Sequence, residues 1–114
     1  MLNQQIKPNQ KWRLGYPLQK NRTFFYRIRN AYPVSVFVID KKNYDKAEKG
    51  DSFESFAGGV EILNQDEKFT LPNKFEGEQI FFVIENTNPM PVTVQWEAGG
   101  LIPTHSSQAV GSGW

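Results

Sequence analysis

The chain has 114 residues, a length typical of one domain with a substantial hydrophobic core. It contains no cysteine, which excludes disulfides, thiolate zinc sites and cysteine nucleophiles. The formal net charge is +1, but residues 1–39 carry seven cations and no acid, whereas residues 40–114 carry six cations and twelve acids. We expect this asymmetry to give the domain a dipolar surface.

The polar N-terminus predicts a flexible arm over residues 1–10, followed by a β-domain over residues 11–98 and a flexible C-terminal tail over residues 99–114. The arm holds no apolar run of the kind found in a secretory signal, and no stretch is long and apolar enough to span a membrane. We therefore expect a cytoplasmic protein, with an excised extracellular domain as the alternative.

The first half of the domain predicts three strands, over residues 11–14, 23–31 and 34–39. The second strand alternates: one face is apolar, and the other holds one aromatic residue and two cations, namely Phe25, Arg27 and Arg29. The third strand is apolar on both faces, which predicts either a central strand or an exposed apolar patch. A break is expected at Tyr32-Pro33, between the second and third strands.

Residues 40–50 are the one helical candidate. Asp40 is a suitable N-cap, and Gly50 fits the position that follows a helix. Tyr44 and Ala47 would rest on the sheet while the charged side chains face water. Because such a helix is short, we expect packing against the sheet to stabilise it.

The second half of the domain predicts further short strands over residues 60–63 and 67–71, with a weaker one over 51–57. Residues 79–85 are apolar on both faces, and residues 92–97 alternate between apolar and polar. The loop between them is rich in Asn and Pro, so these two segments predict a β-hairpin. Seven or eight strands and one short helix are typical of an antiparallel, jelly-roll-like β-sandwich; an open barrel is the competing architecture.

Two segments carry a family resemblance. The run V-S-V-F-V-I-D-K-K-N-Y-D-K-A-E-K-G, residues 34–50, resembles a strand-then-helix segment of jelly-roll accessory domains. The run I-F-F-V-I-E-N-T-N-P-M-P-V-T-V-Q-W-E, residues 80–97, is similar to the last hairpin of domains of the GOLD (Golgi dynamics) type. The resemblance implies a jelly-roll β-sandwich that acts as a non-catalytic interaction module.

Cations interleaved with aromatic residues form the candidate binding surface, a basic strand face made of Lys11, Trp12, Arg13, Phe25, Arg27 and Arg29. This pattern suits an acidic protein partner or self-association, and it also suits single-stranded nucleic acid or anionic lipid. A pI near 7.9 argues against a dedicated nucleic-acid binder. The alternative is a solvated face whose arginines pair with the acids of the same chain.

Aromatic residues suggest a second function. Trp12 and Trp96 are candidates for stacking on a carbohydrate or another small ligand, although burial in the core is the competing interpretation of Trp96. Trp114, in the predicted tail, is a candidate docking tag.

Catalytic and metal-binding patterns are weak. His105 is the single histidine, and Asp40, Asp45, Glu48 and Asp51 do not follow the spacing of an EF-hand loop, so we expect no metal and no cofactor. No G-x-S-x-G sequence is present, and an enzyme using a carboxylate pair is the remaining catalytic alternative. The sequence therefore predicts a non-enzymatic module that binds a protein partner or self-associates through the basic strand face or an exposed sheet edge.

Overall fold

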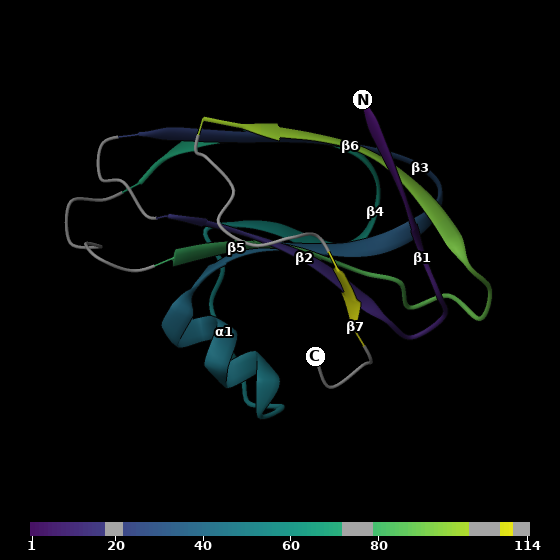
Figure 1. Cartoon of the computed structure of the whole chain (residues 1–114), viewed down its shortest axis with the longest axis horizontal. Coiled ribbons are helices and arrows are strands. Elements are labelled where there is room, and N and C mark those ends of the chain that lie inside the picture. Colours follow the sequence, from purple (N-terminus) through teal and green to yellow (C-terminus); the bar gives the residue numbers. More distant parts are fainter. Residues whose placement is uncertain (18–21, 72–78, 101–107, 111–114) are drawn as a thin grey trace.

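The computed structural model describes residues 1–17, 22–71, 79–100 and 108–110. These residues form seven antiparallel strands and one short helix, with the sheet order β1-β6-β3-β5-β2-β7 and β4 beside β3 (Figure 1). The strands are β1 (Leu2–Ile6), β2 (Lys11–Pro17), β3 (Thr23–Asp40), β4 (Ala57–Thr70), β5 (Gln79–Glu85), β6 (Val92–Gly99) and β7 (Gln108–Val110), and the helix is α1 (Lys41–Glu48). The prediction of a mainly antiparallel β protein with one helix is confirmed.

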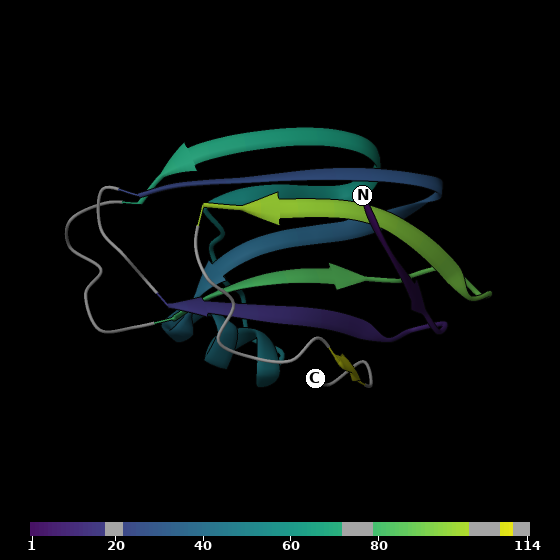
Figure 2. The same ribbon diagram turned by 45° about the horizontal axis from the view of Figure 1, so that its top comes forward.

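The bend of β3 shapes the molecule. Its first half pairs with β4 and β6, and its second half pairs with β4 and β5. The β3–β4 register shifts between Arg29 and Val34, so a bulge over residues 30–33 lies opposite Leu63. Because β3 and β4 bend together there, the sheet curls into a half-barrel, as Figure 2 shows.

The expected break at Tyr32-Pro33 is therefore a bend within one strand, and the predicted second and third strands are continuous. Proline cannot donate a ladder hydrogen bond, and a bulge is a position in a sheet that tolerates it. The separate strands predicted over residues 60–63 and 67–71 are likewise joined in the single long strand β4, which ends at Thr70. At Tyr32-Pro33 the sequence marked the bend of β3 but placed a strand end there.

The core fills the concave side of the half-barrel. As the alternation predicted, Phe24, Tyr26 and Ile28 are buried, and so are the alternate residues of the second half of β3, of β5 and of β6. Trp12 lies among them, with ring centroids 4.7 Å from Trp96 and 6.0 Å from Phe82. Aromatic rings at these separations are in close contact. Aromatic side chains therefore pack together in the core, beside aliphatic ones.

The helix α1 covers the outer face of β5. Asp40 caps it, because one carboxylate oxygen accepts hydrogen bonds from the Asn43 backbone N–H and from the Asn43 side chain, both at 2.8 Å. The Tyr44 ring stacks on Phe81 with centroids 4.1 Å apart. This packing confirms the predicted helix and explains why residues on both faces of β5 are apolar.

The predicted hairpin is wrong. β5 lies between β3 and β2, whereas β6 lies between β1 and β3, so the two strands do not pair with each other. The buried Asn86 starts the loop between them, and its side-chain N–H groups donate to the carbonyl oxygens of Ile6 at 2.9 Å and Met90 at 2.8 Å. This loop crosses the half-barrel and is fixed there by polar contacts to the N-terminal segment.

Both predicted flexible ends contain strands. β1 falls within residues 1–10, where it pairs with β6, and Ile6 is fully buried in the core. β7 falls within residues 99–114 and pairs with β2. Burial of Ile6 anchors β1 to the core. The sequence did not show this strongly, because residues 1–10 have no apolar alternation: Met1, Leu2 and Ile6 are their only large aliphatic residues.

Candidate interaction surfaces

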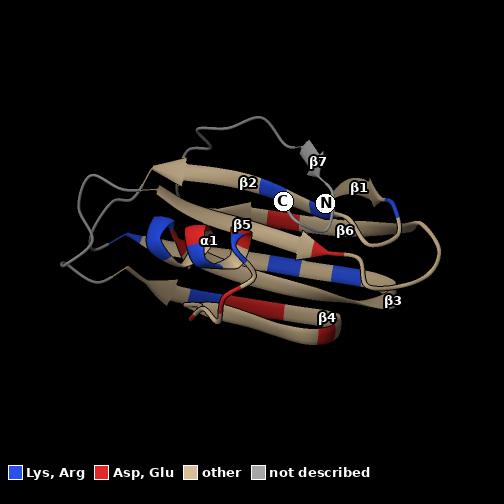
Figure 3. Ribbon diagram, turned by 90° about the horizontal axis from the view of Figure 1, so that it is seen from below, with Lys and Arg blue, Asp and Glu red and all other residues tan. Residues whose placement is uncertain are grey.

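The N-terminal half of β3 presents the predicted basic residues on its outer face, but acids flank them. Arg27 lies opposite Asp66 of β4 on one side and Glu97 of β6 on the other. Figure 3 shows the cationic bands of β3 beside acidic bands of β4. Directly opposed charges of opposite sign attract across a sheet. Positive and negative side chains consequently alternate on this surface. This agrees with the alternative interpretation, in which the arginines pair with acids of the same chain.

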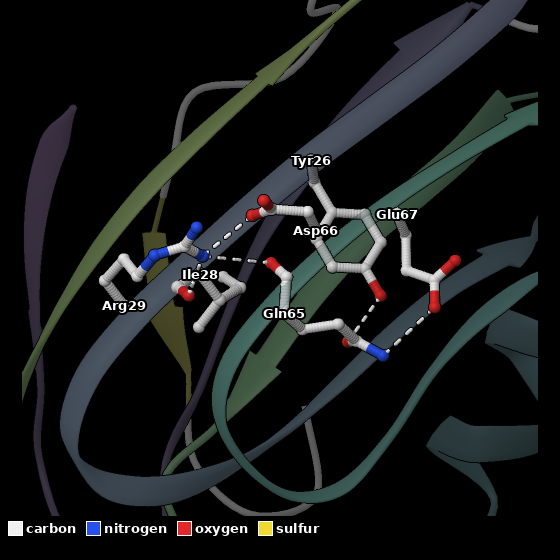
Figure 4. A network of polar contacts seen from close by, with 6 residues as sticks. All are labelled: Tyr26, Ile28, Arg29, Gln65, Asp66 and Glu67. Atoms are coloured by element: carbon white, nitrogen blue, oxygen red, sulfur yellow. Dashed lines mark hydrogen bonds and ion pairs between the residues drawn. The ribbon is translucent and has the colours of Figure 1, made fainter.

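One guanidinium is held in a polar network, drawn in Figure 4. Arg29 Nη1 lies 2.7 Å from a carboxylate oxygen of Asp66 and donates to the Ile28 carbonyl oxygen at 2.8 Å. The hydrogen bond from Arg29 lowers the pKa of the Asp66 carboxyl below its usual value. Beside this pair, the Tyr26 hydroxyl donates to Gln65 Oε1 at 2.7 Å. Arg29 is therefore committed to its own sheet.

Phe25 and Gly99 form a cross-strand pair on the same outer face. A Cβ placed on Gly99 would lie only 2.6 Å from Phe25 Cε1, so the phenyl ring occupies space that any side chain at position 99 would need. Glycine in a strand often marks such a close approach. The result is an aromatic ring supported by backbone, on the outside of the half-barrel.

A shallow groove of about 430 Å³ runs over this face of β6, β3 and β4. The residues that line it are Phe25, Tyr26, Arg27, Asp66, Glu67, Lys68 and Glu97. Tyr26 is fully buried and is paired with Glu67, so these two side chains face the inner side of the sheet. Sequence analysis singled out Phe25 and Arg27 of β3, but Asp66, Glu67, Lys68 and Glu97 come from strands whose pairing with β3 it did not predict. Their alternation on β4 and β6 was visible, yet alternation alone does not identify a neighbouring strand.

The remaining predicted basic residues lie elsewhere. Lys11 and Arg13 belong to β2, which pairs with β5 and β7, so they do not join Arg27 and Arg29 in one face. The Lys11 ammonium lies 3.7 Å from a carboxylate oxygen of Glu85. The Arg13 guanidinium lies over the Tyr44 ring, 5.7 Å from its centroid. The single basic strand face expected from sequence is thus divided between two regions of the sheet.

Trp12 is completely buried, and Trp96 is 7% exposed. Both rings are packed against Phe82 and against each other, so neither offers a free face to a ligand. Ligand stacking at these two positions does not agree with their burial, and core packing, the competing interpretation of Trp96, is confirmed. Trp114 and His105 lie outside the described residues.

The outer edge of β4 is a second candidate surface. Among the strands that the structure describes, β4 pairs with β3 alone. Near its bend, Val60 is 67% exposed and Leu63 is 42% exposed, and Tyr32, in the bulge opposite Leu63, is 48% exposed. An edge strand presents backbone donors and acceptors that another strand can pair with.

Within the described ranges, no cluster of three or more His, Asp or Glu side chains is arranged to hold a metal ion. In the same part of the chain, no helix is long and apolar enough to cross a membrane. No protein-family model matches the chain, and the search of curated proteins gave no match.

Proposed function

We propose that this protein is a non-enzymatic interaction module that binds an extended segment of a protein partner, a second copy of itself included, along the edge of β4. The observation that carries the proposal is a 14-residue strand that, among the described strands, is paired only with β3. Addition of a strand to such an edge gives main-chain hydrogen bonds to the bound segment.

Side chains along this edge support the proposal. Val60 and Leu63 expose apolar surface beside it, and burying an apolar side chain against a partner contributes about 25 cal/mol per Å². Asp66 and Lys68 alternate in sign on the outer face of the same strand. Charged residues on an edge suppress indiscriminate pairing, so they favour a partner strand with a complementary charge pattern.

The test compares edge variants with a matched variant on another strand. Leu63→Lys and Val60→Lys place a charge where the apolar side chains are exposed, and we expect changes in stability within about 0.5 kcal/mol because both positions are on the surface. Thr93→Lys introduces the same charge at an exposed position of β6, away from the β4 edge.

Self-association is measured by sedimentation velocity over a concentration series, and partner binding by quantitative capture from the native source. We expect the edge variants to lose whichever interaction the wild-type chain shows, while Thr93→Lys retains it. Equal association and equal capture by all the variants would rule out the β4 edge.

The finer fold class is part of the same proposal. We propose a jelly-roll-like β-sandwich of the GOLD type. In support, the first half of β3 pairs with β6 on one side of the curled sheet, its second half pairs with β5 on the other side, and β4 follows β3 through the bend. The cytoplasmic location stays a prediction from sequence.

A further inference from the structure

The groove over β6, β3 and β4 has the chemistry of a small-ligand site. At one end lies Phe25, whose ring is supported by the Gly99 backbone and is only half-buried. Next to it on β3, the Arg27 side chain is exposed. An aromatic ring beside planar polar groups is the usual composition of sites that orient a ligand by both stacking and hydrogen bonds.

Charge balance indicates which ligand suits the groove. On the outer face the lining holds two cations, Arg27 and Lys68, and two carboxylates, those of Asp66 and Glu97. Glu67 is paired with the buried Tyr26, and its carboxylate accepts a hydrogen bond from Gln65 Nε2 on the inner side of the sheet. Arg29 is ion-paired with Asp66 at the groove's margin and neutralises one carboxylate. A polyanion would meet carboxylates on both sides of Arg27, and a polycation would meet Arg27 and Lys68. Neither class of charged polymer is favoured.

A neutral ligand with many hydroxyl groups fits this surface better. Each hydroxyl both donates and accepts hydrogen bonds, so it can bridge a guanidinium donor and a carboxylate acceptor. Hydrogen bonds to charged groups are stronger than those between neutral groups. The apolar C–H face of a sugar ring can pack on Phe25 at the same time.

We propose that this groove binds a neutral carbohydrate, with a sugar ring on Phe25 and its hydroxyls between Arg27 and the carboxylates of Asp66 and Glu97. The site lies on the outer face of the sheet, and it does not depend on strand addition at the edge of β4. The two proposals are therefore tested by different variants.

The experiment records two-dimensional amide NMR spectra of the full chain while neutral gluco-, xylo-, manno- and chito-oligosaccharides are added. Each is added to about 10 mM, tenfold above a dissociation constant of about 1 mM. At least one is expected to shift the amide signals of residues 25–27, 66–68 and 97–99. Shifts confined to other strands, or none with any of the four sugars, would overturn the proposal.

Three variants locate the contact for the sugar that binds. Phe25→Ala and, separately, Arg27→Ala should each weaken binding about tenfold, equivalent to about 1.4 kcal/mol. Tyr32→Ala removes an exposed aromatic residue that does not line the groove, and its affinity should equal that of the wild-type chain.

Thermal melting checks that each variant is folded. Because Arg27 is exposed, its variant remains informative even if loss of Phe25 destabilises the sheet. Wild-type affinity in the folded Arg27→Ala protein would overturn the proposal, as would equal losses in all three variants.

Discussion

At the scale of single residues, the buried side chain of Asn86 connects the loop end of the half-barrel. Its amide donates to the carbonyl oxygens of Ile6 and Met90, and its Oδ1 accepts from the backbone and side-chain N–H groups of Asn88 at 2.9 Å. Asn88 in turn donates to the Pro33 carbonyl oxygen at 2.7 Å. Three segments distant in sequence are thus joined through the side chains of Asn86 and Asn88.

Asn86→Ala should cost about 3 kcal/mol of unfolding free energy, because the buried Ile6 carbonyl and the half-buried Met90 carbonyl and Asn88 N–H lose a partner, at about 1 kcal/mol each. The measurement is urea denaturation of the wild-type and variant proteins. Asn64→Ala, at an exposed position of β4, is the matched control and should change stability by less than about 0.5 kcal/mol. A loss for Asn86→Ala no larger than that of the control would contradict this role.

The buried tyrosines make stability sensitive to alkaline pH. Burial raises the pKa of Tyr16 from 10.0 to about 12, and burial together with the Glu67 carboxylate raises the pKa of Tyr26. Above pH 10 the unfolded chain releases these protons while the folded protein still holds them. The contribution of Tyr16 to the unfolding free energy is therefore fully present below pH 10 and is lost as the pH rises toward 12. The Tyr16 contribution is of the order of 2 kcal/mol.

Unfolding free energies measured between pH 8 and 12 should decline above about pH 10, and Tyr16→Phe should make that decline shallower. A phenolate absorbance titration of the folded protein provides the independent check. Identical slopes for the two proteins would show that Tyr16 releases its proton equally in both states.

At the scale of elements, sequence predicted what depends on local pattern. The inward and outward faces of β3, β5 and β6 are as expected, and so are α1, its Asp40 cap and the Tyr44 contact with the sheet. These features follow from side-chain periodicity and from capping chemistry, both of which act over a few residues.

Strand partners were not predictable in the same way. β5 and β6 adjoin a loop typical of a hairpin, yet each pairs with strands distant in sequence. Alternation specifies which face is buried, but many registers and neighbours satisfy the same alternation. The candidate groove was missed for this reason: Phe25 meets Gly99, and Arg27 meets Asp66 and Glu97, only once β6 and β4 flank β3.

At the scale of the whole molecule, the fold places acids of the second part of the sequence beside the arginines of β3. The cationic strand β3 lies between strands that carry acids, and Arg29 is paired with Asp66 at 2.7 Å. The field of a close pair of opposite charges falls off faster with distance than that of a single charge, and salt screens what remains beyond a Debye length, about 8 Å at physiological ionic strength. Around Arg27 and Arg29 the surface is therefore mixed in sign and lacks the basic face that sequence alone predicted.

Weak retention on heparin is the expected consequence, with elution of the wild-type chain below physiological salt. Neutralising the flanking acids with Asp66→Asn and Glu97→Gln together should expose the arginines as a basic face and raise the salt concentration needed for elution. Thr93→Gln, which changes no charge on β6, is the control. An unchanged elution position in the double variant would show that the acids do not mask the arginines.

The position of β1 in the sheet also affects how the protein is made. This strand is synthesised well before its partner β6, which spans Val92–Gly99. Since ribosomes add about 5–20 residues per second, β1 waits at least several seconds for its partner. During that interval Ile6 and Trp12 have no completed core to enter, so a nascent chain stalled before Val92 should be a substrate for chaperones that hold exposed apolar segments.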